Sequence, residues 1–554
     1  MGDAHLSLLA DDLLLKVLHA AGAPAVACAA TLCRRLRWAQ QELSALPAFA
    51  AAAATGDTDD SISELVAAAV RDAREQMHAA IDVCIVFVAG ALRGRGDAQA
   101  LHSVVEECQA LLPPGTLVLG CCGRGLFGVE RGQPVEIDPS ERQARGASVL
   151  LGRMPGCVLR AFAAREAPKG GWSSESACSA WLGLQEAGAA AGPGANLQPL
   201  SCLIFPHSSA GQDVHGCIEG LQAAYPHMLV TGGISSGQGD LFCSQPVPPL
   251  AEESGGARRR PRGVARAKFV GLAICKEEGG DAGSSGVGTG GGSDAPVAGG
   301  LAVQGMEGAQ PVLSRLVMVR NVGFLEGAGG GPDAELMAVA DAQLEGVEGP
   351  IGIGMLKDLA YSQTELGLWA GPVQEGAAGP ASFDAALVAG EPATLLQLYG
   401  VVEGAEIVAA ADDVGAFAAV LAQARQPGRT LCAQALRLSS AGALRALTAG
   451  VRQLAAACPA RHALLPTVTA GLVVVSCTAK GEQLHGVAGV EAGAMHASSG
   501  QLPLAGVYAD GEIGPTIHNA TSVLRWSGRR GGGGSSTSKV QGFTTVITAL
   551  AAAP

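Results

Sequence analysis

The sequence predicts an α/β protein, in which a short, all-helical N-terminal module precedes two related α/β lobes with mixed sheets covered by helices. Three observations lead to this prediction. Leucines recur at helical spacing near the N-terminus. Short apolar runs alternate with helical stretches over most of the remaining chain, and an apolar strand followed by spaced glycines occurs three times.

Residues 6–46 form the predicted helical module. Apolar side chains fall at helical spacing around Asp11 and Asp12, which suit the start of a helix. A break at Gly22–Pro24 separates this helix from a second one that begins near Ala25. Because a unit of this size buries little surface by itself, we expect it to dock on a partner.

The first predicted lobe spans residues 61–250 and opens with a helix at 61–80. Apolar runs predict its strands at Cys84–Val88, Leu117–Leu119, Ser148–Leu151, Cys202–Phe205 and Met228–Val230. Helical stretches lie between them, including 97–112 and 211–224. This alternation predicts a mixed or parallel sheet that is covered by helices.

The second predicted lobe spans residues 301–554. It follows a segment at 251–300 that contains the basic stretch Arg258–Arg262, a strand at Phe269–Ile274 and a Gly/Ser-rich insert expected to be disordered. The strands expected in this lobe are Val312–Val319, Ile351–Met355, Gly471–Cys477 and Val540–Ile547. The helices expected in it are Pro392–Tyr399 and a pair between 412 and 457.

The three glycine segments share one pattern, in which a strand ends at a glycine and a second glycine follows five residues later. Another apolar strand lies about thirty residues upstream of each, so the pattern predicts three strand–helix–strand units that end in glycine loops. Two interpretations stay open. The glycines either permit a close crossing of strands or let backbone N–H groups cradle an anionic ligand. The pairs are Gly120 and Gly125, Gly232 and Gly237, and Gly506 and Gly511.

Charge and composition argue against several classes of protein. The formal net charge of −13 disfavours nucleic acid as the main partner. No long apolar run suggests a membrane span, and the acidic N-terminus lacks the basic lead of a secretory signal, so we expect a cytoplasmic and/or nuclear protein. The fifteen cysteines include no CxxC pair and the histidines form no metal motif, so we expect free thiols and no metal or cofactor.

Two segments near the N-terminus, Leu9–Leu18 and Ala30–Trp38, together resemble an F-box. The resemblance implies that this module docks onto a Skp-type linker protein and thereby joins a cullin-RING ubiquitin ligase. The side chains expected to contact the linker are Leu9, Leu13, Leu14, Val17, Leu18 and Leu32.

Most of the remaining chain resembles the FIST family, with an N-terminal domain at 61–250 and a C-terminal domain at 301–554. The resemblance implies that the FIST domains select a target protein for ubiquitylation without catalysing a reaction themselves. The alternative is a sensory domain that binds a small ligand such as an amino acid and has no ligase role. The matching segments are Val83–Val88, Leu119–Gly120, Leu151–Gly156, Val230–Ser236, Gly390–Ala393, Leu398–Tyr399, Val475–Gly481, Val490–Ala492, Gly506–Gly514 and Gly542–Val546.

The tentative ligand contacts lie in or beside the glycine loops. Glu512 follows a strand and stands next to Gly511, where its carboxylate would either hold a ligand's ammonium group or cap backbone amides of a neighbouring loop. Cys477 precedes Lys480, which suggests either an activated thiol or a buried structural cysteine. The candidate residues are Gly120, Gly125, Gly232, Gly233, Ser235, Cys477, Gly506, Tyr508, Gly511 and Glu512.

Overall fold

The structure is a computed structural model that describes most of residues 47–551. The residues outside the description are 1–46, 78–79, 91–93, 142, 169–170, 173, 185–195, 212, 237–240, 246–263, 266, 279–297, 304–316, 327–334, 345–363, 373–385, 387–390, 403–405, 412–418, 421, 425, 428, 438–439, 459–469, 516–521, 527–537, 542–543 and 552–554. The predicted F-box-like module at 6–46 therefore lies outside the described residues. The chain divides into two compact units: Met1–Ala302, Leu447–Thr516 and Val523–Pro554 form the first, and Val303–Ala446 and Ile517–Ser522 form the second.

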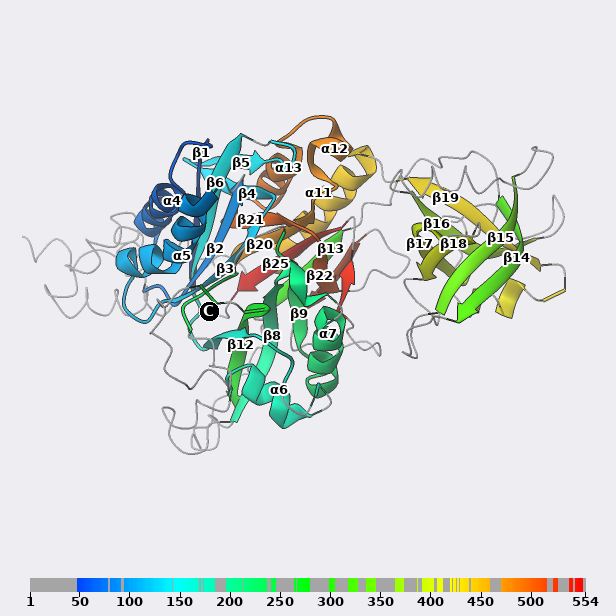
Figure 1. Ribbon diagram of the computed structural model, residues 1–554, viewed down its shortest axis with the longest axis horizontal. Coiled ribbons are helices and arrows are strands. Elements are labelled where there is room, and N and C mark those ends of the chain that lie inside the picture. Colours follow the sequence, from blue (N-terminus) through cyan, green and yellow to red (C-terminus); the bar gives the residue numbers. More distant parts are fainter. Residues whose placement is uncertain are drawn as a thin grey trace, which may run out of the picture. The chain divides into compact units, whose positions relative to one another are not determined.

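The first unit contains three successive segments with the same order of elements (Figure 1). Each has an opening strand, a helix, a strand–helix–strand unit, strands that leave for another sheet, and a closing strand. The first segment contains β1 (Ala48–Asp57), α4 (Ile62–Gln76), β2 (Val83–Gly90), α5 (Gly94–Leu111), β3 (Leu117–Gly123), β4 (Gly125–Glu130), β5 (Gln133–Ile137) and β6 (Ala144–Arg153).

The second segment contains β7 (Val158–Ala164), α6 (Glu175–Trp181), β8 (Asn196–Pro206), the 3-10 helix η2 (Ser208–Ala210), α7 (Asp213–Ala224), β9 (Leu229–Gly233), β10 (Leu241–Cys243), β11 (Val264–Ala265) and β12 (Phe269–Glu278). The third segment contains β13 (Ala298–Val303), α11 (Ser440–Ala457), β20 (Ala470–Cys477), α12 (Gly481–His485), α13 (Val490–Ser498), β21 (Leu504–Ala509), β22 (Glu512–Pro515), β23 (Ser522–Trp526), β24 (Ser538–Gln541) and β25 (Thr545–Ala551). Along the chain, the second unit begins at the end of β13 and extends into α11, and it also includes Ile517–Ser522.

Each segment builds the centre of one sheet. Sheet A has the strand order β1-β6-β2-β3-β10-β11, sheet C has β7-β12-β8-β9-β22-β24, and sheet B has β23-β13-β25-β20-β21-β4-β5. The two strands of each strand–helix–strand unit pair in parallel, namely β2 with β3, β8 with β9 and β20 with β21. The three predicted units are therefore confirmed, and each occupies the same place in its own sheet.

Each sheet is completed by strands from a different segment. Strand β4 of the first segment pairs with β21 of the third, β22 of the third pairs with β9 of the second, and β10 of the second pairs with β3 of the first. The exchange is cyclic, so no segment holds a complete sheet by itself. The predicted α/β class with mixed sheets and helices is confirmed. The domain limits at 61–250 and 301–554 stay a prediction, and the strands within those limits share sheets B and C.

One hydrophobic core joins the three sheets. Val83, Ile85 and Phe87 of β2 contribute to it together with side chains of β8 and β20, while the alternate residues of β2 pack against α4 and α5. Both faces of this strand are buried, which explains its continuous apolar run. The rings of Phe87 and Phe205 meet edge to face with their centroids 5.5 Å apart, so sheets A and C contact each other within this core.

The first glycine of each predicted pair lies where two parallel strands approach closely. Gly120 pairs with Val86 and Gly232 pairs with Ile204. A Cβ atom would come within 1.7 Å of the Val86 carbonyl oxygen at Gly120, and within 1.8 Å of the Ile204 carbonyl oxygen at Gly232. Both glycines have positive φ, +156° and +144°, so only glycine fits these positions without strain. Gly506 occupies the equivalent site, where a Cβ would lie 2.3 Å from the Val474 carbonyl oxygen.

The second unit contains a closed barrel with the strand order β14-β15-β18-β17-β16-β19. Its strands are β14 (Val317–Glu326), β15 (Glu335–Leu344), β16 (Thr364–Pro372), β17 (Ala393–Val402), β18 (Glu406–Ala411) and β19 (Arg429–Arg437). The helix predicted at Pro392–Tyr399 is wrong, because β17 pairs with β16 and β18 on its two sides and this pairing outweighs the local pattern. Of the helical pair predicted between 412 and 457, α11 is confirmed, but β19 occupies the middle of that range.

Candidate functional site

The loops that follow β3, β9 and β21 meet and hydrogen-bond to one another. Ser236 N donates to the Cys122 carbonyl oxygen at 3.3 Å, and Arg124 N donates to the Tyr508 carbonyl oxygen at 3.2 Å. Ile234 N donates to the Gly511 carbonyl oxygen at 2.8 Å. The three predicted glycine loops therefore lie together, at the carboxyl ends of the parallel strands where ligands bind in many α/β proteins.

Protein atoms fill the space beside the glycines of these loops. A Cβ atom at Gly233 would meet the side chain of Val475 at 2.2 Å, and one at Gly125 would meet the Ile137 carbonyl oxygen at 2.3 Å. At Gly511 the nearest atom belongs to Ile234, at 3.0 Å. These neighbours favour the interpretation that the glycines permit a close crossing of strands. Ligand contact at the loop glycines stays a prediction.

Glu512 is fully buried at the start of β22, opposite Gly233. Its Oε2 accepts a hydrogen bond from Thr544 N at 3.2 Å, which agrees with the alternative in which it caps a neighbouring backbone segment. Its Oε1 has no hydrogen-bond partner among the described residues. Burial raises the pKa of Glu512 well above its ordinary value, although Thr544 N, the Lys480 ammonium and the Cys477 thiol act in the opposite direction.

Polar side chains from β20, the α12–α13 region and β25 form a buried network. Lys480 Nζ donates to Thr545 Oγ1 at 2.8 Å and lies 3.4 Å from Glu491 Oε1. Ser476 Oγ donates to Glu491 Oε2 at 3.0 Å, and His485 Nε2 lies 3.4 Å from Glu491 Oε1. The Lys480 and Glu491 side chains are 0% and 1% exposed. These contacts join β20, the α12–α13 region and β25 around one buried ion pair.

The electrostatics of this network fix Glu491 in its charged form. Burial alone would raise the pKa of Glu491, but the Lys480 ammonium, His485 and the Ser476 hydroxyl outweigh it and lower the pKa to about 2. Lys480 follows Cys477 closely in the sequence, and its backbone N–H donates to the Cys477 carbonyl oxygen at 3.0 Å, but its ammonium group contacts Thr545 and Glu491. The sequence had suggested Lys480 as an activator of Cys477, and it missed Glu491 as its partner.

Tyr508 connects this network to β5. Its hydroxyl donates to Glu136 Oε1 at 2.7 Å, and its ring lies against that of Phe127 with centroids 4.4 Å apart. Glu136 Oε2 accepts from Ala492 N at 2.9 Å, in the first turn of α13. Helix α13 begins after Gly489, which has no side chain to cap it, so Glu136 supplies this cap from another strand. Tyr508 is among the candidates predicted from the sequence, whereas Glu136 is not.

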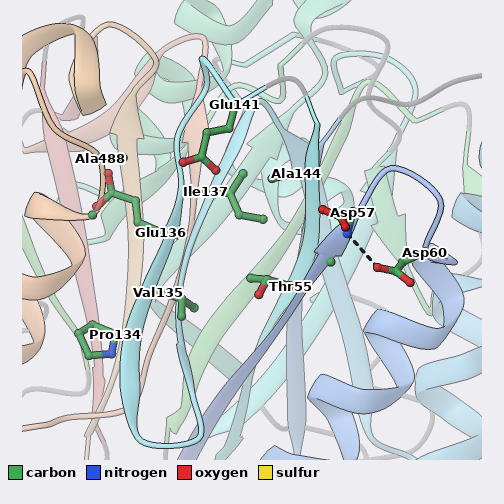
Figure 2. A pocket seen from close by; sticks show the side chains of 12 residues that line it. Thr55, Asp57, Asp60, Pro134, Val135, Glu136, Ile137, Glu141, Ala144 and Ala488 are labelled. Atoms are coloured by element: carbon green, nitrogen blue, oxygen red, sulfur yellow. Dashed lines mark hydrogen bonds between the residues drawn. The ribbon is translucent and has the colours of Figure 1, made fainter.

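A pocket of about 580 Å³ lies beside Glu136, between β1 and β6 of sheet A and β5 of sheet B (Figure 2). We call it the seam pocket. It is lined by Thr55, Gly56, Asp57, Asp60, Pro134, Val135, Glu136, Ile137, Glu141, Ala144, Ala488 and Gly489. Carboxylates and small apolar side chains thus share its walls, and none of the candidate ligand contacts from the sequence is among them.

The lining of the seam pocket contains four carboxyl groups and no Lys, Arg or His. Burial, aided by the Glu491 carboxylate, raises the pKa of Glu136 to about 7 against the hydrogen bonds from Ala492, Tyr508 and Gly489. Burial and the neighbouring carboxylates of Asp138 and Glu482 also raise the pKa of Glu141. The ionisable side chains that line the pocket are therefore all acidic, and a bound cation would favour the charged forms that burial disfavours at Glu136 and Glu141.

A second pocket, of about 460 Å³, lies near α6 and the end of α7. It is lined by Glu175, Ser176, Ser179, Leu197, Gln198, Pro199, Ala224, Tyr225, Pro226, His227 and Met228. It holds one carboxylate and one imidazole, and none of its lining residues belongs to the buried network around Lys480.

Several predictions fall outside what the structure describes. The six expected linker contacts from Leu9 to Leu32, the basic stretch Arg258–Arg262 and most of the Gly/Ser-rich insert belong to this group. Within the described part of the chain, no helix combines the length and the apolar character that a membrane span requires. Across the same residues, His, Cys, Asp and Glu side chains form no group of three or more that would hold a metal ion.

No family model matches the chain, and no curated protein matches it.

Proposed function

We propose that this chain is the substrate-recognition adaptor of an SCF-type (Skp-cullin-F-box) ubiquitin ligase. Residues 6–46 dock a Skp-type linker, and the FIST domains at 61–250 and 301–554 select the target protein. The chain itself catalyses no reaction, and it acts in the cytoplasm and/or the nucleus. The observation that carries this proposal is the order of motifs, in which the F-box-like leucines precede the FIST-like segments.

The architecture of the described residues supports this proposal in one respect. An adaptor needs a body that keeps its target-binding surface in a fixed geometry. Strands exchanged among three segments and one shared core make the three-sheet unit a single cooperative body. The FIST-like stretches around Gly120, Gly232 and Gly506 occupy equivalent places in that body, as expected for parts of one recognition module.

Capture of the purified Skp-type linker by the full-length chain tests the adaptor role. We expect a stable complex that is lost when Leu14→Asp and Leu18→Asp are introduced together, because charges on the docking face cannot be desolvated. The matched control is Val487→Asp, which places the same charge at an apolar residue that is 62% exposed on the three-sheet unit. A wild-type chain that never captures the linker would refute the adaptor proposal.

The second candidate function is a sensory domain that binds a small ligand, and the seam pocket favours it. A pocket of about 580 Å³ matches the size of small-molecule sites. Its Glu136 contacts the first turn of α13 and, through Tyr508, strand β21, so a bound ligand would contact elements from two segments. Ligand binding should raise the melting temperature by mass action, and a ligand at about a hundred times its Kd adds about 2.7 kcal/mol. Failure of every ligand to change the melting temperature would argue against this role.

A further inference from the structure

We propose that the seam pocket binds a linear organic dication, in which two ammonium groups are joined by a short alkyl chain. This inference rests on the second proposed function, the ligand-binding role of the three-sheet unit. It goes further by assigning the site to residues outside the glycine loops. It also assigns a chemical class of ligand that differs from a free amino acid.

The positions of the carboxylates indicate a ligand with separated positive charges. Asp57 and Asp60 come from the end of β1 and the turn after it, whereas Glu136 and Glu141 come from β5 and the turn before β6. Figure 2 shows the two pairs on opposite sides of the pocket, with Ile137 between them in this view. A ligand with two separated ammonium groups would place one positive charge beside each pair.

The apolar part of the wall fits the chain between the charges. Val135 and Ile137 of β5, together with Pro134 and Ala144, contribute apolar surface to the wall of the pocket. Each methylene group of the ligand that is fully buried against this surface contributes about 0.8 kcal/mol of favourable free energy. A small inorganic ion would gain nothing from this surface.

The spread of the carboxylates also disfavours a metal ion. Among the described residues, which include all that line the pocket, no three His, Cys, Asp or Glu side chains converge to hold a metal. Ca²⁺ takes six to eight oxygen ligands and Zn²⁺ takes four converging ligands, so separated carboxylates suit these ions poorly. Ammonium groups instead form hydrogen bonds with individual carboxylates.

The lack of basic side chains in the lining separates a diamine from an amino acid. A zwitterion would bring its own carboxylate into a pocket whose twelve lining residues include no Lys, Arg or His. The neighbouring Arg145 is buried and donates from Nη1 to the Asp60 carbonyl oxygen at 3.1 Å, and it does not line the pocket. The carboxylate of an amino acid would therefore meet like charges, which lowers its affinity.

Glu136 gives the ligand a direct connection to the fold. Its carboxylate accepts hydrogen bonds from Tyr508 OH, Ala492 N and the Gly489 backbone, which leaves one of its four lone pairs for an ammonium group. A cation bound there would strengthen the charged form of the carboxylate that caps α13. Binding would therefore stabilise the first turn of α13 as well as the pocket itself.

Isothermal titration calorimetry on the full-length chain tests the proposal, with 1,4-diaminobutane and spermidine as probes. Butylamine, lysine and magnesium chloride serve as comparisons. We expect saturable binding of one diamine per chain, with butylamine, lysine and magnesium at least tenfold weaker. Asp57→Asn combined with Glu141→Gln should weaken diamine binding by about tenfold for each carboxylate removed.

The matched control removes the same charge elsewhere. Glu75→Gln combined with Glu106→Gln neutralises two exposed helical carboxylates outside the pocket, and it should change the diamine Kd less than twofold. An equal loss in this control would show non-specific attraction to an acidic protein and overturn the proposal. Absence of diamine binding to the wild type would also overturn it, as would tighter binding of lysine or magnesium.

A pocket-filling variant separates failure of the dication proposal from failure of the ligand-binding role. Ala144→Phe fills the pocket without altering its charge. If an uncharged or anionic compound raises the melting temperature of the wild type and not of Ala144→Phe, the pocket is a ligand site but the dication proposal is wrong. If no compound, diamines included, distinguishes the two proteins, both the dication proposal and the ligand-binding role at this pocket are overturned.

Discussion

Replacing Lys480 by Met keeps the alkyl stem of the side chain and removes only the buried ammonium group. In the structure that ammonium lies 3.4 Å from Glu491 Oε1 and donates to Thr545 Oγ1 at 2.8 Å. The substitution leaves the Glu491 carboxylate buried with only His485 and Ser476 as partners. Breaking a buried pair in this way costs about 3–5 kcal/mol, because an uncompensated charge stays inside the protein.

The pKa of Glu491 gives an independent figure of similar size. An acid whose pKa falls from 4.5 in the unfolded chain to about 2 in the folded one contributes about 3 kcal/mol of stability at neutral pH. Because the folded pKa is the lower one, this contribution is present above pH 4.5. It is lost as the pH falls towards 2. Acid should therefore destabilise the wild type in this range more than it destabilises Glu491→Gln.

A double-mutant cycle with Lys480→Met and Glu491→Gln measures the pair. The free energy of unfolding would be obtained in urea at pH 7. Hydrogen exchange of β20 and β21 would follow the three-sheet unit, because a chain of two units need not unfold in one step. We expect each single variant to lose about 3 kcal/mol and the double variant to lose clearly less than the sum of about 6 kcal/mol.

An exposed ion pair provides the control for this cycle. Lys268 Nζ lies 2.9 Å from Asp213 Oδ2, but the two side chains are 41% and 48% exposed. Lys268→Met should therefore cost about 0.5 kcal/mol or less. Strict additivity of the Lys480→Met and Glu491→Gln losses would refute the reasoning, as would a loss at Lys480 no larger than that at Lys268.

Three further predictions follow from the described contacts. Gly232→Ala should prevent stable folding, because its Cβ would come within 1.8 Å of a backbone carbonyl oxygen. The space around Gly493 in α13 is open, so Gly493→Ala should raise the stability measured by thermal unfolding by about 0.5–1 kcal/mol. The pKa of Glu136 is raised to about 7, so the wild type should lose about 1–3 kcal/mol between pH 5 and pH 8, after allowance for its partial exposure. Glu136→Gln should show no such loss in urea titrations at the two pH values. Burial raises the pKa of the Cys202 thiol strongly, so mass spectrometry should find it alkylated by iodoacetamide only after unfolding.

The sequence predicted the three strand–helix–strand units, because their signals are local. The backbone contacts at Gly120, Gly232 and Gly506 permit only glycine. The requirement is therefore visible in the sequence as a recurring glycine. The apolar run at Val83–Val88 likewise records a strand that is buried on both faces. Strength of local pattern therefore explains why these units were found.

The exchange of strands among the sheets could not be predicted from the sequence. Nothing in the local pattern of Leu126 and Phe127 states that β4 pairs with a strand in the third segment rather than with its own sheet. The error at β17 has the same origin, since neighbouring strands decide its conformation. Long-range pairing is a property of the folded chain and leaves little trace in short windows.

The candidate site was predicted only in part, for a related reason. The spaced glycines form a clear sequence pattern that predicts loops, and Tyr508 and Lys480 lie close to these loops in the sequence. Glu136 is a single carboxylate in a short strand, and only the fold brings it next to Tyr508 and Ala492. Its alternation with Val135 and Ile137 predicted a strand and gave no indication of a pocket.

The cyclic sharing of strands has a consequence for how the protein is made. Tyr508 and Glu136 bond across 372 positions of the chain, so the first sheet elements leave the ribosome long before their partners exist. Until then β4 and β5 have an unpaired edge. Such an edge promotes aggregation or the binding of chaperones. Removal of the third segment would take away the centre of sheet B and two strands of sheet C, and only sheet A would keep all its strands. The barrel, by contrast, lies in the connection between β13 and α11. It could therefore be shortened without disrupting the cyclic exchange of strands among the three sheets.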